Sequence, residues 1–388
     1  MKVLIIPGNH DLANMGDNAT LIVAVRQLKR YLPALEAHVV TRAPERLRSL
    51  LPDAEAVVIG APSGVPGGLA DMLRRFARLR GMVRRRRYRD WSSRIEPVLQ
   101  QAQAVILSGQ GILTDAFAHE AVWRLGLLEH AHRLGKRTAL FSQGLGIVKD
   151  ARLAAAMRRV LPQMDLIVAR NHADALRLRA EFGCPDERIG AGGDDGLQFP
   201  QRIADPAHSS GLGVSFRLAD YAGTQQVSEE RWQALGTDLR DAAHALGATL
   251  QPVPIEAGDL LAVEQILGLR PEPRRGLELE GLTRQVAQCR VVVTGSYHSA
   301  VFALAMGIPA ICLVSSDYYA AKFGGLITQF PDGCQILDTR TSPLGALGEV
   351  VRTLWERAPS ISPAIASASR ENVARNLEFY RAFINTLA

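Results

Sequence analysis

Short apolar strand signals alternate with amphipathic helix signals along the chain, and no other feature of the sequence constrains the fold as strongly. The strand signals are rich in β-branched residues, as expected for a parallel sheet that helices cover on both faces. We therefore expect an α/β fold. The expected strands are 2–6, 37–41, 56–60, 103–108, 137–142, 165–169, 188–191, 211–216, 249–253, 290–294, 310–314 and 334–337. The expected helices include 17–31, 118–134, 151–162, 171–182, 229–246, 258–268, 282–288, 298–306, 342–357 and 368–386.

The alternation pauses once, in a stretch rich in proline, serine and polar residues near 200–211. A chain of 388 residues is too long for one ordinary core, so we expect two Rossmann-like domains joined at this stretch. The expected domains are 1–205 and 206–366, followed by a final segment, 367–388.

The composition is that of an ordinary globular protein, with 47% hydrophobic and 22% charged residues. Four scattered cysteines have no paired spacing, which favours reduced thiols over a disulfide framework or a zinc site. No secretion signal and no apolar run of membrane-spanning length is recognisable, so the cytoplasm is the expected compartment.

The formal net charge is +6, and much of the excess lies in an arginine-rich segment that includes Arg84–Arg89. A solvated helix or a mobile loop would explain this segment. An anionic acceptor or the inner face of an anionic membrane would also suit it. Nucleic acid is not expected, because no nucleic-acid-binding module is recognisable.

A β-branched run, 291–294, ends abruptly in Gly295 and Ser296, and a helix pattern follows at once. This places His298 at the carboxyl end of a buried strand and in the first turn of a helix. In open α/β sheets ligands bind at this edge, and a helix N-terminus favours anions. Imidazole is also suited to proton transfer near neutral pH, although a structural histidine stays an alternative.

Two cations of the second half follow strand signals in the same way. Arg217 comes directly after 211–216, and an arginine fork suits a carboxylate or a phosphate. A structural ion pair with an acid of the other domain is the alternative. Lys322 lies about one turn into a helix that Asp317 is suited to cap, and an ordinary surface lysine is the alternative there. No cluster of residues has the spacing of metal ligands.

Small and polar residues also follow the strand signals of the first half. Glycines in these positions let backbone N–H groups approach a ligand, and asparagine or aspartate can bind hydroxyls or cap the next helix. The residues concerned are Asn14, Gly16, Asp17, Gly109, Gly111, Asp115, Gln143 and Arg170.

Taken in order, these motifs resemble those of the polysaccharide pyruvyl transferase family over nearly the full length. They are Asn14-x-Gly16-Asp17-x-Ala19, Gly109-x-Gly111-x-x-x-Asp115, Gln143-x-x-Gly146, Ala169-Arg170 with Leu176 and Gly183, the Asp194-Asp195 strand end, Ser215-x-Arg217, His298 with Ala303 and Gly307-x-Pro309, and Lys322 with Gly325. The chain departs from the family in having Ser296-Tyr297-His298 where Arg-Leu-His is usual, and Gly109-Gln110-Gly111 where three glycines are usual.

The resemblance implies a fold of the GT-B type, in which two domains face each other across a cleft and the final helix lies at their boundary. It implies transfer of pyruvate from phosphoenolpyruvate, the co-substrate, to sugar hydroxyls as a ketal, in the assembly of exopolysaccharides and related glycans. No other cofactor and no metal is expected. The acceptor would be a sugar or glycan precursor, with lipid-linked and nucleotide-linked forms both open, as is a homo-oligomer.

The resemblance also distributes roles among the residues. His298 is the expected proton-transfer group, with Asp17 as a second catalytic candidate. The expected donor-binding residues are Arg217, Lys322, Ser296, Tyr297 and Ser299. The expected acceptor-binding residues are Asn14, Gly16, Gly109, Gly111, Asp115, Gln143 and Arg170. A glycosyltransferase that uses a nucleotide-sugar donor and a non-catalytic protein that binds a glycan or anion are the alternatives.

Overall fold

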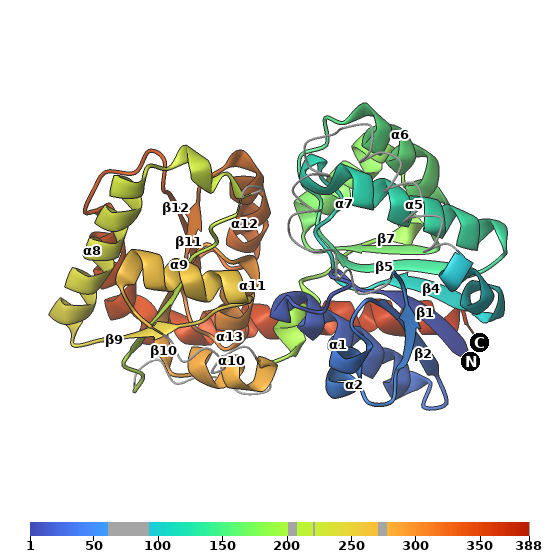
Figure 1. The fold of residues 1–388 in the computed structure, drawn as a ribbon, viewed down its shortest axis with the longest axis horizontal. Helices are drawn as coiled ribbons and strands as arrows, with labels where there is room; N and C mark the ends of the chain where they lie inside the picture. The colour runs from blue at the N-terminus through green and yellow to red at the C-terminus, as the bar shows by residue number, and fades with distance from the viewer. Residues whose placement is uncertain (61–92, 201–207, 220–221, 271–277, 388) are drawn as a thin grey trace.

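The computed structural model describes residues 1–60, 93–200, 208–219, 222–270 and 278–387. It contains two α/β lobes, each built around its own parallel sheet (Figure 1). The expected fold class is therefore confirmed. The arginine-rich run Arg84–Arg89 and residues 201–207 of the expected linker lie outside the described residues.

The first lobe holds a seven-stranded sheet in the order β3-β2-β1-β4-β5-β6-β7. Helices α1 and α2 cover one face, and α5, α6 and α7 cover the other. The strands are β1 Lys2–Ile6, β2 Glu36–Thr41, β3 Glu55–Val58, β4 Ala104–Leu107, β5 Arg137–Gln143, β6 Leu166–Ala169 and β7 Ile189–Ala191. The helices are α1 Met15–Tyr31, α2 Pro44–Leu50, α5 Ala118–Arg133, α6 Ala151–Val160 and α7 His172–Phe182.

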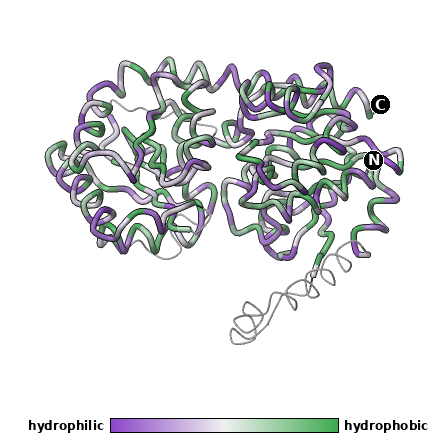
Figure 2. The backbone as a smooth tube through the Cα atoms, turned by 90° about the horizontal axis from the view of Figure 1, so that it is seen from above, coloured by the Kyte–Doolittle hydropathy of each residue, from purple (hydrophilic) through white to green (hydrophobic). Residues whose placement is uncertain are grey.

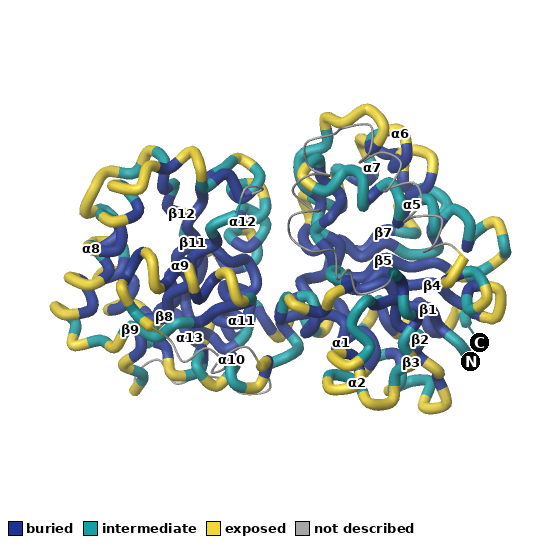
Figure 3. Tube along the Cα trace, in the orientation of Figure 1, coloured by how far each residue is buried: buried dark blue, intermediate teal, exposed yellow. Residues whose placement is uncertain are grey.

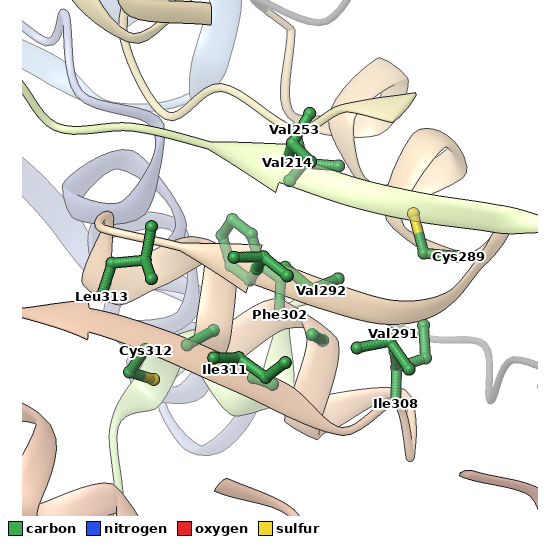
Figure 4. Close-up of a cluster of buried hydrophobic side chains, with 14 of the residues drawn as sticks. Val214, Val253, Cys289, Val291, Val292, Phe302, Ile308, Ile311, Cys312 and Leu313 are labelled. Atoms are coloured by element: carbon green, nitrogen blue, oxygen red, sulfur yellow. The ribbon is translucent and has the colours of Figure 1, made fainter. Parts of the chain in front are cut away.

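The second lobe holds a five-stranded sheet in the order β12-β11-β10-β8-β9. Its core is a continuous set of aliphatic and aromatic side chains between strands and helices, part of which Figure 4 shows around Val292 and Phe302. The strands are β8 Gly211–Ser215, β9 Thr249–Pro252, β10 Cys289–Thr294, β11 Ala310–Val314 and β12 Cys334–Asp338. The helices are α8 Glu229–Leu246, α9 Ala257–Leu267, α10 Leu279–Val286, α11 Tyr297–Ala305 and α12 Asp317–Gln329.

Burial and hydropathy follow the same plan in both lobes. The strands are buried, while exposed residues lie on the outer helices and turns (Figure 3). Apolar segments accordingly occupy the interior of each lobe in Figure 2. Hydrophobic burial is the main term that stabilises such cores.

One long helix, α13 (Ala346–Asn385), runs from the second lobe to the first (Figure 1). We expected two helices, 342–357 and 368–386, and this expectation was wrong. Pro359 and Pro363 lie inside the helix, but its buried face continues past them through Ile361 and Ile365. Packing on both lobes therefore outweighs the helix-breaking tendency of proline here.

Candidate functional site

A cavity of about 340 Å³ lies between the two lobes. Its walls come from loops that follow the carboxyl ends of strands in both sheets, as expected for open α/β sheets. The helices α1, α9, α11 and α12 all begin at its edge. The lining residues are Gly8, Asn9, His10, Asp11, Asn14, Asp17, Arg42, Gly111, Ile112, Phe117, Glu120, Arg217, Ile255, Glu256, Ser296, Tyr297, His298, Tyr318, Tyr319 and Lys322.

His298 lies in the first turn of α11, where the sequence places it, and it crosses to the first lobe. A Cβ atom at Gly16 would lie 1.9 Å from its Nδ1, so only glycine lets the imidazole approach α1 this closely. Its Nε2 lies 3.7 Å from Oδ2 of Asp194, which follows β7. The imidazole of one lobe therefore faces a carboxylate of the other.

Arg170 approaches the same carboxylate oxygen of Asp194. Its Nε lies 2.8 Å from Asp194 Oδ2, and both side chains are almost completely buried. Burial alone raises the pKa of Asp194, but Arg170 and then His298 hold that pKa below its ordinary value. Asp194 is therefore a buried carboxylate that can orient the imidazole of His298. Arg170 Nη2 has no hydrogen-bond partner among the described residues.

Lys322 of α12 is surrounded by aromatic rings. Its Nζ lies 5.0 Å from the ring centre of Tyr297 and 5.6 Å from those of Tyr318 and Tyr319. No carboxylate in the described part of the chain forms an ion pair with it. Burial and the nearby Arg170 lower the pKa of Lys322 to about 7. The ammonium group is therefore available to an anionic ligand, which would stabilise its charge.

Arg217 follows β8 and lines the cavity, but its guanidinium already has acidic partners. It forms an ion pair with Glu256, and its Nε lies 3.0 Å from Oδ1 of Asp259. Its Nη2 donates to Asp259 Oδ2 at 3.0 Å and to Ser296 Oγ at 3.2 Å. The structural ion pair that was the alternative for Arg217 is thus present, although both acids belong to its own lobe.

Several other expected residues meet at the cavity. Asn14 caps α1 by accepting from the backbone N–H groups of Gly16 and Asp17. Asp17 is half-buried and packs against Gly8. At Gly111 a Cβ atom would lie 3.6 Å from Arg170 Nη1 and 3.7 Å from Lys322 Nζ. Ser316, not Asp317, caps α12.

Four expected site residues have structural contacts and do not line the cavity. The carboxylate of Asp115 accepts from the backbone N–H groups of Lys149 and Asp150, and Ser299 Oγ donates to a carbonyl at 2.9 Å. Gln143 donates to two loop carbonyls, and Gly109 packs against a threonine of α1. These residues shape the loops around the cavity.

Sequence reasoning gave no role to Asp194, Glu256, Asp259, Glu120 or His10. Asp194 belongs to one of the motifs that carry the family resemblance. Glu120 belongs to none of them, so no signal in the sequence pointed to it. In the described part of the chain no group of acidic, histidine or cysteine side chains is arranged to hold a metal ion. None of the described helices is long and apolar enough to cross a membrane.

Known proteins place this geometry in context. A search of curated proteins found no match. A protein described as a UDP-N-acetylglucosamine 2-epimerase from Listeria monocytogenes has a similar structure, with 12% identity, a TM-score of 0.59 and coverage of 95% of this chain and 94% of that one. UDP-GlcNAc 2-epimerase from Neisseria meningitidis is also similar, with 12% identity, a TM-score of 0.57 and coverage of 97% of this chain and 100% of that one. Arabidopsis thaliana UGT89C1 has 12% identity, a TM-score of 0.56 and coverage of 99% of both chains.

These likenesses show that the fold is of the GT-B type, because the identities are too low to carry more than the fold. The sequence model of the family described as polysaccharide pyruvyl transferase matches residues 14–317, which include the strand ends of both lobes. The chain therefore belongs to the polysaccharide pyruvyl transferase family, a family of transferase enzymes.

Proposed function

We propose that the protein transfers a pyruvyl group from phosphoenolpyruvate to two hydroxyls of a sugar or glycan precursor, as a cyclic ketal. The observation that carries the proposal is the position of His298, which lines the interdomain cavity and faces the buried carboxylate of Asp194. A carboxylate paired with imidazole is a standard arrangement for a group that gives up and regains a proton.

The chemistry requires such a group because phosphoenolpyruvate is an enol ester. His298 donates a proton to the methylene carbon, and the central carbon then bonds to a sugar hydroxyl oxygen as that hydroxyl loses its proton. A second hydroxyl attacks the same carbon and gives its proton back to His298, the bond from that carbon to the phosphate oxygen breaks, and phosphate leaves. Asp17 lines the same cavity and is our candidate to receive a hydroxyl proton.

The two anionic groups of the donor need cationic partners. Lys322 and Arg170 converge on Gly111 from different lobes, and Lys322 has no acidic partner among the described residues. We assign the donor anion to these two cations, with the N-termini of α11 and α12 adding partial positive charge. Arg217 shares its charge with two carboxylates and would contribute less.

A glycosyltransferase with a nucleotide-sugar donor is the second candidate. It draws support from the UDP-sugar enzymes among the structural neighbours, one of which was solved with UDP-GlcNAc bound. The same cations could then meet a diphosphate.

The test is an incubation of the protein with phosphoenolpyruvate and a panel of sugar acceptors, with phosphate release and acceptor mass as readouts. We expect phosphate release that depends on an acceptor, and a product heavier by one pyruvyl group. Release of a nucleotide from a nucleotide sugar, without any reaction of phosphoenolpyruvate, would select the second candidate. Tight donor binding without any turnover would indicate a non-catalytic binding protein.

A further inference from the structure

One end of the cavity has no role in the proposed chemistry so far. It is built by the loop after β1, the end of β2 and the start of α5, all in the first lobe. We refer to it as the outer end, defined by Asn9, His10, Asp11, Arg42, Phe117 and Glu120.

A completely buried arginine organises this end. Arg124 of α5 donates through Nη2 to Glu120 Oε1 at 2.9 Å and to Gly8 O at 3.1 Å, and its Nη1 donates to Gln110. Gln110 in turn donates to the carbonyl of Ile6, the last residue of β1. The carboxylate of Glu120 is thus held against the sheet by a buried cation, which fixes its position better than a surface ion pair would.

The same carboxylate is open toward the cavity. Its side chain is 38% exposed, and the contacts that the described residues make with it all involve Oε1. His10 lies beside this pair: its Nδ1 is 3.2 Å from the carbonyl oxygen of Val40, and its Nε2 is 3.3 Å from Arg124 Nη2 and 4.0 Å from Glu120 Oε1. Glu120 Oε2 therefore remains as an acceptor in a fixed position.

The charges of the outer end are unfavourable for an anion. The acids Asp11 and Glu120 line the outer end, and Asp17 lines the same cavity. Arg42 is paired with Asp11 at 3.2 Å, and Arg124 is paired with Glu120. Among the described residues, an anionic group would meet carboxylates whose nearest arginines are already engaged, whereas neutral hydroxyls would find acceptors.

We propose that Glu120 is a specificity-determining residue that accepts hydrogen bonds from the hydroxyls of an uncharged sugar ring in the outer end. The aromatic ring of Phe117 supplies the apolar surface on which such a ring can pack. The assignment of this ring as the pyruvyl acceptor rests on the proposed function, but its binding does not. Uronic acids and sugar phosphates are excluded from this end.

The first experiment needs no variant. Methyl glucoside, galactoside and mannoside are each compared with the matching methyl uronide, by saturation-transfer NMR and by turnover with saturating phosphoenolpyruvate. We expect at least one neutral glycoside to bind, and its uronide to have a kcat/KM lower by about tenfold or more. Equal or better use of the uronides would overturn the proposal, as would a failure of all neutral glycosides to bind.

The second experiment uses Glu120→Gln, with Glu129→Gln as the control, because Glu129 of the same helix is paired with Arg159 and does not line the cavity. Loss of a charge-assisted hydrogen bond should raise the KM or Kd for the neutral glycoside about tenfold. The ratio of kcat/KM between the glycoside and its uronide should become smaller. The KM for phosphoenolpyruvate and the behaviour of Glu129→Gln should stay unchanged. An unchanged glycoside affinity in folded Glu120→Gln would overturn the inference. Glycoside binding that depends on Glu120 without any use of phosphoenolpyruvate would instead contradict only the proposed function.

Discussion

Gly16 shows how one missing side chain can determine whether a site forms. Its Cα lies so close to the imidazole of His298 that a Cβ atom would overlap the ring. We predict that Gly16→Ala displaces His298 and lowers kcat by roughly a hundredfold, the lower range for loss of an acid–base group. Gly126→Ala is the matched control, because a Cβ atom there meets nothing within 4 Å. Near-normal turnover by Gly16→Ala would show that the approach of His298 to α1 is unimportant.

The proposal gives His298 two separable roles, proton transfer and attraction of the donor anion. Both His298→Ala and His298→Gln should lose at least about a hundredfold in kcat, because glutamine can donate a hydrogen bond but cannot transfer a proton. Steady-state kinetics at saturating donor measure this loss. If the glutamine variant keeps most of its turnover, His298 serves only in binding, and the acid must be sought among Lys322, Tyr297 and Asp17.

Lys322 should make donor binding depend on pH. Its lowered pKa of about 7 means that the ammonium form predominates below that pH and the neutral amine above it. Donor affinity should therefore fall as the pH rises from about 7 to about 9, by up to about tenfold per pH unit. Lys322→Arg should remove this dependence, since arginine stays charged over the whole range. The same pH dependence in both proteins would assign it to another group.

At the scale of elements, α13 runs from one lobe to the other and contacts the segment after β7 that carries Asp194. Tyr380 of α13 donates to Oδ2 of the adjacent Asp195 at 2.7 Å, and Asn376 donates to Oδ1 at 3.1 Å. Burial raises the pKa of Asp195 to about 7, even though these hydrogen bonds oppose the shift. The helix therefore determines how residues 194 and 195 are presented to the second lobe.

Removing one of these hydrogen bonds should be measurable. Tyr380→Phe leaves a buried carboxyl oxygen without its donor, which should lower the free energy of unfolding by about 1–3 kcal/mol. Urea unfolding measures the change, with Tyr31→Phe as the control because the Tyr31 hydroxyl forms no hydrogen bond with any described residue. An unchanged unfolding midpoint for Tyr380→Phe would contradict the structural role of the bond.

The elements also show where sequence reasoning succeeds. Strand β10 and the start of α11 could be predicted because the β-branched run and the glycine that follows it are local signals. The continuous α13 could not be predicted in this way. The two prolines give a local signal for a break, but the packing that keeps the helix whole comes from residues distant in sequence.

At the scale of the whole molecule, the site is composite. The backbone N–H of Met15 donates to the carbonyl of Ile255 at 3.0 Å, and Gln329 of α12 donates to the carbonyl of Arg170 at 3.0 Å. Both bonds join the two lobes next to the cavity. The partnership of His298 with Asp194 exists only in this arrangement of the lobes, so no motif in either half could reveal it.

The partners of Arg217 illustrate the same limit. Its position after a strand was predictable, but its neutralisation by Glu256 and Asp259 depends on the fold of the neighbouring loop and helix. Sequence alone therefore placed these residues at the edge of the sheets, but it assigned Arg217 to the donor and Arg170 to the acceptor without information on the two carboxylates that pair with Arg217.

The central claim is that a proton from the protein reaches the methylene carbon of phosphoenolpyruvate while the central carbon becomes a ketal. The most direct test is to run the reaction in heavy water and to analyse the sugar product by mass spectrometry and NMR. The account predicts a pyruvate ketal whose methyl group carries one deuterium, formed by the wild-type protein and lost in His298→Gln. A product that keeps an enolpyruvyl ether, or a sugar transferred without any pyruvyl group, would contradict it.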